Sequence, residues 1–152
     1  MSNVDSVGQN TGASFGNFAL SSATGVSLAA TGNAVVSLPI LSGGLTKGNS
    51  VVTSGSVIIR RITIQNPSAN VSTGNITIYT SNDGNTSNAV TTSGGTLLTN
   101  MTATGTWQDL TIISPYLANA VSGYNTQALY VGVVANVAAT VDIRVYGDVV
   151  SF

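Results

Sequence analysis

The side chains that most often carry enzyme chemistry are missing from this sequence. It has no cysteine, no histidine and no glutamate, and its five carboxylate side chains are aspartates scattered along the chain. General acid–base catalysis near neutral pH draws mainly on histidine, glutamate or a perturbed aspartate, and a serine nucleophile needs a basic partner. The commonest zinc ligands and all disulfides are excluded at the same time. We therefore expect a protein that is not an enzyme and that holds no metal or other cofactor.

Two adjacent arginines, Arg60 and Arg61, lie within the strongest strand pattern of the first half of the chain, residues 56–67. Strict alternation would put Arg60 on the same side as Ile58 and Ile62. A β-bulge at the arginines would shift the alternation by one residue. Without a bulge, one arginine points inward and needs a carboxylate partner. The candidate carboxylates are Asp109, Asp142 and Asp148. An anion site built by the two arginines is the functional alternative.

Aromatic rings are the other candidates for binding, because a ring face can stack on a sugar. Around the single tryptophan, Leu110 and Ile112 share one side with Gln108, while Trp107 and Ile113 share the other, so the pattern leaves open which side faces inward. A carbohydrate-binding module would need several exposed rings on one face or in a shared groove. Its candidate rings are Trp107, Tyr116, Tyr124, Tyr130 and Tyr146.

Charge and hydropathy argue against nucleic-acid and membrane partners. Four basic and five acidic residues give a net charge of −1, which offers no basic surface to a phosphate backbone. No apolar run approaches the roughly 20 residues of a membrane-spanning helix. The amino terminus has neither the basic nor the apolar region of a secretory signal.

The composition favours strands and turns over helices. Apolar residues make up 43% of the 152 residues, 17 are glycine, and only 6% are charged, against about 25% in an average globular protein. About eight strand patterns, separated by loops rich in Gly, Ser, Asn and Thr, predict an all-β, single-domain, jelly-roll-like β-sandwich over residues 25–152, with little or no helix. Pro39 suits an edge strand or a bulge. A helical turn is plausible only in residues 114–125.

Residues 127–150 contain the clearest pair of strands. Their alternation predicts a buried odd-numbered stripe: Leu129, Val131, Val133, Ala135, Val141, Ile143, Val145 and Val149. The predicted outward contact surface is Tyr130, Arg144, Tyr146 and Asp148. Two pairings stay open. A hairpin with its turn at residues 137–139 would place Val133 opposite Ile143. In a jelly roll, the two strands would instead lie in opposite sheets, with their odd stripes meeting across the core.

Residues 1–24 are polar, small and punctuated by glycine, with Phe15 and Phe18 as their only substantial apolar anchors. Such a segment cannot fold alone. We expect a flexible N-terminal arm, which is either a disordered tail or a segment that becomes ordered against a neighbouring subunit by docking its two phenylalanines.

One part of the sequence has a family resemblance. LYVGVVANVAATVDIRVYGDVV, residues 129–150, resembles the carboxy-terminal strands of small tailed-phage virion proteins, in which an LYV strand, an alanine-rich turn and a final Tyr-Gly-Asp-like motif recur. RRITIQNP and NITIYTSNDG, within residues 60–84, are similar to earlier paired strands of such proteins.

The resemblance implies a capsid decoration, or cement, protein. Such a protein is made in the host cytoplasm, binds the major capsid protein on the capsid exterior and stabilises the outer lattice. It is commonly a homo-oligomer, and a trimer is expected. The alternatives are a tail or fibre component and, from another functional class, a carbohydrate-binding β-sandwich module.

Overall fold

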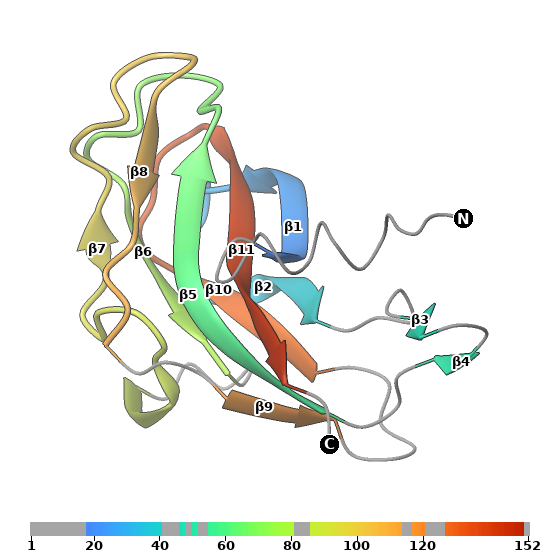
Figure 1. Ribbon diagram of the computed structural model, residues 1–152. Coiled ribbons are helices and arrows are strands. Elements are labelled where there is room, and N and C mark those ends of the chain that lie inside the picture. The colour runs from blue at the N-terminus through green and yellow to red at the C-terminus, as the bar shows by residue number, and fades with distance from the viewer. Residues whose placement is uncertain are drawn as a thin grey trace, which may run out of the picture.

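The computed structural model describes residues 18–40, 46–47, 50–51, 55–80, 86–113, 117–120 and 127–150. Apart from one 3-10 turn, the regular secondary structure of this part of the chain consists of antiparallel strands (Figure 1). The elements are β1 (Phe18–Ser27), β2 (Gly32–Ile40), β3 (Thr46–Lys47), β4 (Ser50–Val51), β5 (Gly55–Gln65), β6 (Asn75–Tyr79), the 3-10 turn η1 (Thr86–Asn88), β7 (Thr96–Leu97), β8 (Trp107–Asp109), β9 (Leu117–Ala120), β10 (Gln127–Ala135) and β11 (Thr140–Val150).

The strands form two layers. The first sheet has the order β1-β11-β5-β8, with β9 also paired to β5, and the second sheet has the order β2-β10-β6-β7. Strands β3 and β4 pair only with each other, and β9 lies off the main order of the first sheet. The remaining eight strands pair in a nested way: β1 with β11, β2 with β10, β5 with β8, and β6 with β7. First with last and second with seventh is the pairing of a jelly roll. The predicted all-β jelly-roll sandwich is confirmed.

Strands β10 and β11 lie in opposite sheets, so the hairpin alternative was wrong and the opposite-sheet alternative is confirmed. Six residues of the predicted odd-numbered stripe are buried: Leu129, Val131, Val133, Val141, Ile143 and Val145. Ala135 is only half-buried, and the side chain of Val149 lies outside the described residues. The two stripes meet because each strand turns its apolar side toward the other sheet.

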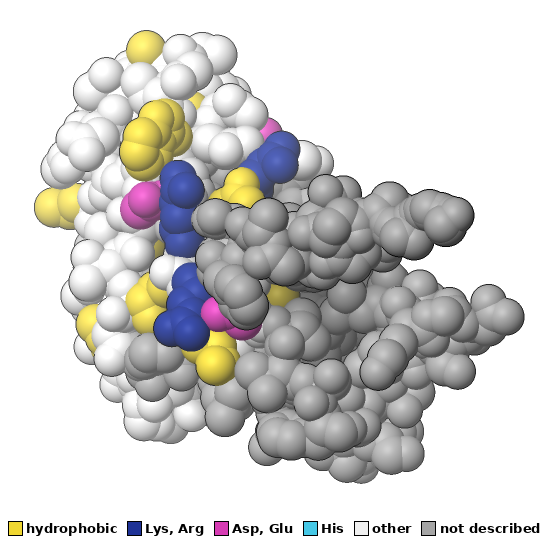
Figure 2. Space-filling view, viewed as in Figure 1, with side chains coloured by type: hydrophobic (Ala, Val, Ile, Leu, Met, Phe, Trp, Pro, Cys, Tyr) yellow, Lys and Arg dark blue, Asp and Glu magenta, His cyan; other side chains and the backbone are white. Residues whose placement is uncertain are grey.

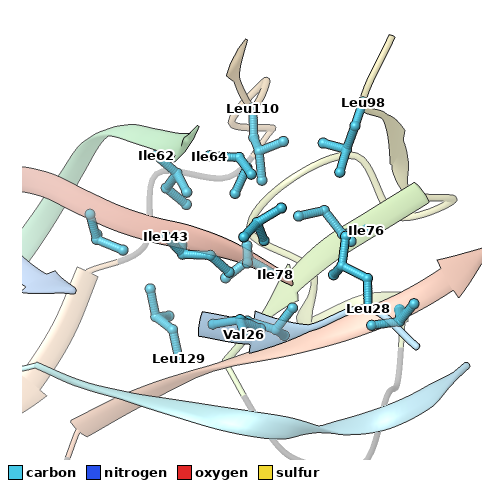
Figure 3. Close-up of a cluster of buried hydrophobic side chains, with 14 of the residues drawn as sticks. Val26, Leu28, Ile62, Ile64, Ile76, Ile78, Leu98, Leu110, Leu129 and Ile143 are labelled. Carbon is cyan, nitrogen blue, oxygen red and sulfur yellow. The ribbon is translucent and has the colours of Figure 1, made fainter. Parts of the chain in front are cut away.

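The core is the layer between the sheets. Figure 3 shows Ile62, Ile64 and Ile143 of the first sheet converging with Ile76 and Ile78 of the second. All five are fully buried. Leucines outside the strands complete the layer: Leu28, Leu98 and Leu110. This packing, rather than any covalent link, joins the two sheets.

The segment that begins with β8 closes one side of this core. Gln108 is buried and its side-chain nitrogen donates to the carbonyl of Leu97, 2.7 Å away, while its oxygen accepts from the backbone N–H of Asn100 at 3.1 Å. Leu110 is buried on the same side, whereas Trp107 is exposed. The structure thus resolves the ambiguity around the tryptophan, and Gln108 can face inward because both ends of its amide are bonded.

Two boundaries differ from expectation. Strand β1 begins at Phe18, whose backbone lies opposite Gly147, so residues 18–24 of the predicted arm belong to the first sheet. Leu20 explains this pairing, since it is buried in the core. Residues 117–120, predicted as part of a helical turn, form strand β9 on the edge of β5. The prediction for Pro39 is confirmed, because β2 is an edge strand.

A β-bulge in β5 resolves the conflict at the two arginines. Tyr146 of β11 lies opposite Arg61, but the next residue, Gly147, lies opposite Ile59, which leaves Arg60 as the extra residue. Ile59 is therefore buried, while both arginines are exposed. Of the two alternatives for the arginines, the bulge is confirmed, and neither arginine enters the core.

Gly147 of β11 lies beside this bulge, where the backbones of β11 and β5 approach each other closely. A β-carbon at this position would overlap the carbonyl oxygen of Ile58 and would come within 2.9 Å of the Leu20 side chain. The carbonyl belongs to the backbone of a central strand and cannot move aside without disturbing the sheet. Glycine is thus required here by close packing.

We expect Gly147→Ala to destabilise the fold by about 1–3 kcal/mol, the usual range for overpacking in a closely packed site. Urea unfolding followed by circular dichroism measures this difference. The matched control is Gly94→Ala, because a β-carbon at Gly94 meets no atom within 4 Å. Equal unfolding midpoints for the two variants would contradict the role given to Gly147.

Candidate functional site

Charged side chains gather on the outer face of the first sheet. Six charged side chains are described, and all of them lie on this face: Arg60, Arg61, Asp109, Asp142, Arg144 and Asp148. Figure 2 shows dark-blue and magenta side chains next to one another on the face that β5, β8 and β11 form, with hydrophobic side chains beside them. The four strands of the second sheet contain no charged residue. The two outer faces of the sandwich therefore differ in chemistry.

Arg61 is at the centre of the charged face. Its guanidinium carbon lies 5.6 Å from the ring centre of Tyr146, the residue opposite it on β11, and 5.8 Å from the ring centre of Trp107. Both distances are within the range of cation–π attraction. Its Nε also donates to Oδ1 of Asp109 at 3.0 Å. Two rings and one carboxylate hold the guanidinium in place.

The Asp109 carboxylate is also held by a residue of β5. Thr63, directly opposite it on β5, is buried, and its hydroxyl donates to the same Oδ1 at 2.6 Å. No described residue donates to Oδ2, and 43% of the Asp109 side chain is exposed. The carboxylate thus has one oxygen committed to the sheet and one oxygen turned to the surroundings.

Trp107 is the most exposed large hydrophobic side chain in the described part of the chain, at 57%. It lies on β8, an edge strand only three residues long, opposite Gln65 of β5. Its inward-facing neighbour Gln108 anchors the strand. The indole is therefore presented at the rim of the first sheet by backbone pairing and not by burial of the ring.

The other two carboxylates have structural partners. Asp148 bonds Nε of Arg60 at 2.8 Å. Asp142 accepts from the backbone N–H of Gly25 at 2.9 Å and from the amide of Asn66 at 3.0 Å, which fastens an irregular part of β1 to β11. Arg60 and Arg61 therefore pair with two of the carboxylates proposed from the sequence, but at the surface. Because each arginine is balanced by a carboxylate, the arrangement gives little support to an anion site.

The predicted contact residues do not form one surface. Arg144, Tyr146 and Asp148 share the outer face of the first sheet, but Tyr130 is on β10, in the second sheet, opposite Tyr79. Phe18 begins β1, and its side chain is not described. Phe15 lies outside the described residues. Sequence reasoning did not place Arg61, Asp109 and Trp107 together, since only the pairing of β5 with β8 brings them side by side.

The same placement bears on the carbohydrate-binding alternative. Of its five candidate rings, Trp107 and Tyr146 share one face, while Tyr130 belongs to the other sheet. Tyr116 and Tyr124 lie outside the described residues. The described chain thus offers two rings on a common face, with Arg61 between them, and not the platform of three that an extended glycan would need.

We expect a modest and salt-dependent coupling between Arg61 and Asp109, because both side chains are nearly half exposed. A double-mutant cycle of Arg61→Ala and Asp109→Ala should give about 0.2–1 kcal/mol of coupling in dilute buffer, decreasing at 1 M NaCl. Urea unfolding at the two salt concentrations measures it. Arg144→Ala serves as the control, since Arg144 forms no ion pair with a described residue. A coupling that is unchanged by salt would contradict an electrostatic pair.

No three histidine, cysteine or acidic side chains in the described ranges are grouped so as to hold a metal ion. No helix among these residues is long and apolar enough to cross a membrane. Comparison with protein-family models, curated protein sequences and solved structures finds no match for the chain.

Proposed function

We propose that this chain is a non-enzymatic virion structural protein that binds the outside of a capsid as a decoration, or cement, protein and stabilises its lattice. Its partners would be the major capsid protein and further copies of itself, most simply in a trimer. The observation that carries the proposal is the unequal chemistry of the two sheets: one outer face holds all the described charged side chains and two aromatic rings, whereas the strands of the other sheet are uncharged.

The charged face has the residue types of a protein contact surface. Arginine, tryptophan and tyrosine are the residues that most often dominate binding energy at interfaces. Here Arg61 contacts both Trp107 and Tyr146, so the arginine side chain is already ordered and loses little conformational entropy on binding. Arg144 extends the same face along β11. This order favours repeated noncovalent contact with a rigid partner.

The fold and the carboxylates support a structural role over a catalytic one. Jelly rolls are common among viral capsid and lectin domains. Asp109, Asp142 and Asp148 each accept hydrogen bonds that tie strands together. The similarity of residues 129–150 to tailed-phage virion proteins adds to the proposal, and Phe15 and Phe18 remain candidates for contact with a neighbouring subunit.

We expect Arg144→Asp to weaken binding to capsid particles by about ten-fold, because it reverses an exposed charge near the centre of the proposed face. Co-sedimentation of the purified chain with particles of the virus whose genome encodes it measures the affinity. Cryo-electron microscopy of the complex should then show many symmetric copies on the capsid exterior. Copies confined to the tail would instead assign the chain to a tail or fibre.

Val134→Asp is the matched control for this experiment. Val134 is 46% exposed on β10, so an aspartate there adds a charge to the other sheet without disturbing the core. Retained binding by this variant and weakened binding by Arg144→Asp support the assigned face. The reverse result would move the contact to the second sheet, and a complete lack of particle binding by the unmodified chain would refute the proposal.

The proposed trimer can be tested on the purified chain alone. Sedimentation velocity of the purified chain should show a species of three times the 15.3 kDa chain mass whose share grows with protein concentration. Removal of residues 2–17 should lower that share if the arm contributes to contact between subunits. A concentration-independent monomer would contradict the trimer, although not by itself binding to a capsid.

A further inference from the structure

Trp107 is largely exposed to solvent, and its ring is not part of the hydrophobic core. Its ring is 57% exposed, whereas the inward positions of the same segment, Gln108 and Leu110, supply the contacts that close the core. A large exposed ring beside ordered polar groups is a common feature of ligand sites.

The polar groups next to Trp107 form one donor–acceptor pair. Arg61 uses only its Nε for a described partner, so its terminal NH₂ groups are available as donors. Asp109 uses Oδ1 for Arg61 and Thr63, so Oδ2 is available as an acceptor. The ion pair makes this patch electrically balanced. It is thus suited to a neutral ligand that both donates and accepts hydrogen bonds, and not to a bare anion.

We propose that Trp107, Asp109 and Arg61 form a binding site for a single neutral pyranose ring, such as the terminal sugar of a glycan. The apolar C–H face of the sugar would lie on the indole, and two adjacent hydroxyl groups would reach the two polar side chains. One hydroxyl donates to Oδ2 of Asp109, and its neighbour accepts from the guanidinium of Arg61.

Galactosides fit this arrangement best among common sugars. Their axial 4-hydroxyl leaves the hydrogens of C3, C4 and C5 together on one face, which gives a continuous apolar patch of about the width of an indole. A nucleobase could also stack on Trp107, but the phosphates of a nucleotide would approach the Asp109 carboxylate and are disfavoured by like charge. A second ring for an extended glycan is not available beside Trp107, since Tyr146 lies on the far side of Arg61.

The sugar site shares Trp107 and Arg61 with the face proposed to contact the capsid, so a chain bound to a capsid through that face would not hold the sugar at the same time. Because one ring of the ligand makes all the contacts, we expect a dissociation constant on the order of 1 mM for a simple glycoside. A chain that failed to bind capsids could still bind the sugar, and the converse is equally possible.

The chain contains its own reporter, because Trp107 is its only tryptophan. Titration of the purified chain with methyl β-galactopyranoside should change the tryptophan emission in a saturable way. Methyl β-glucopyranoside and methyl α-mannopyranoside test the preference among neutral sugars, and glucuronate and adenosine monophosphate test anionic ligands. Asp109→Asn should weaken binding by about five-fold or more, since an amide replaces the acceptor that holds Arg61.

Variants without the reporter are followed by saturation-transfer-difference NMR on the sugar protons. Trp107→Ala should abolish the transfer, and Trp107→Phe should restore part of it. Ile113→Ala, which removes a side chain of similar exposure at the other end of the segment, should leave it unchanged. The site is overturned if no glycoside alters the emission, if only the anionic ligands do, or if capsid particles alone shift it, in which case Trp107 is a protein-contact residue.

Discussion

The arrangement of the charged face depends on one constraint, the β-bulge that Arg60 makes in β5 opposite Gly147. In a strand without a bulge, side chains alternate strictly, and one of two adjacent arginines has to enter the core. The extra residue lets Ile59 and Ile62 both face inward while Arg60 and Arg61 both remain outside. Burial of an arginine without a closely bonded carboxylate is among the most unfavourable changes a core can suffer. The bulge avoids that cost and at the same time places two guanidiniums on one surface.

The bulge places the two arginines on the outer face of β5, and the jelly-roll strand order places other side chains of this face next to them. The last strand, β11, lies between β1 and β5. Its even-numbered side chains therefore lie beside the outward-pointing side chains of both neighbouring strands. Tyr146 thereby lies opposite Arg61, and β8 on the far side of β5 adds Asp109 and Trp107. Residues separated by up to 85 positions in sequence, from Arg61 to Tyr146, become contacts because two neighbouring antiparallel pairs share one central strand. The site is a product of strand order more than of any local motif.

This explains which features could be predicted from the sequence. Alternation along a single strand is local, so residue types alone predict the buried stripe of residues 129–145. They leave two alternatives open for the arginines, a bulge or an inward side chain, and two for Pro39, an edge strand or a bulge. Pairing between distant strands is not local. Tyr130 and Tyr146 look equivalent in sequence but belong to different sheets. The contact between Arg61 and Trp107 could not be predicted from their spacing in the sequence. Residues 117–120 form β9 because the edge of β5 is available to them, although their pattern also suited a helical turn.

The balance of charge on this face limits how it can recognise a partner. Arg60 is paired with Asp148 and Arg61 with Asp109, so the face has polar groups and rings but little net field. Long-range steering requires an excess of one sign, and its rate advantage is lost when opposite charges are interleaved. Recognition must therefore depend on short-range contacts: ring faces, the remaining donors of the arginines and the free oxygen of Asp109. Such contacts are weak singly and gain strength by repetition, which suits a protein displayed in many copies on a regular surface.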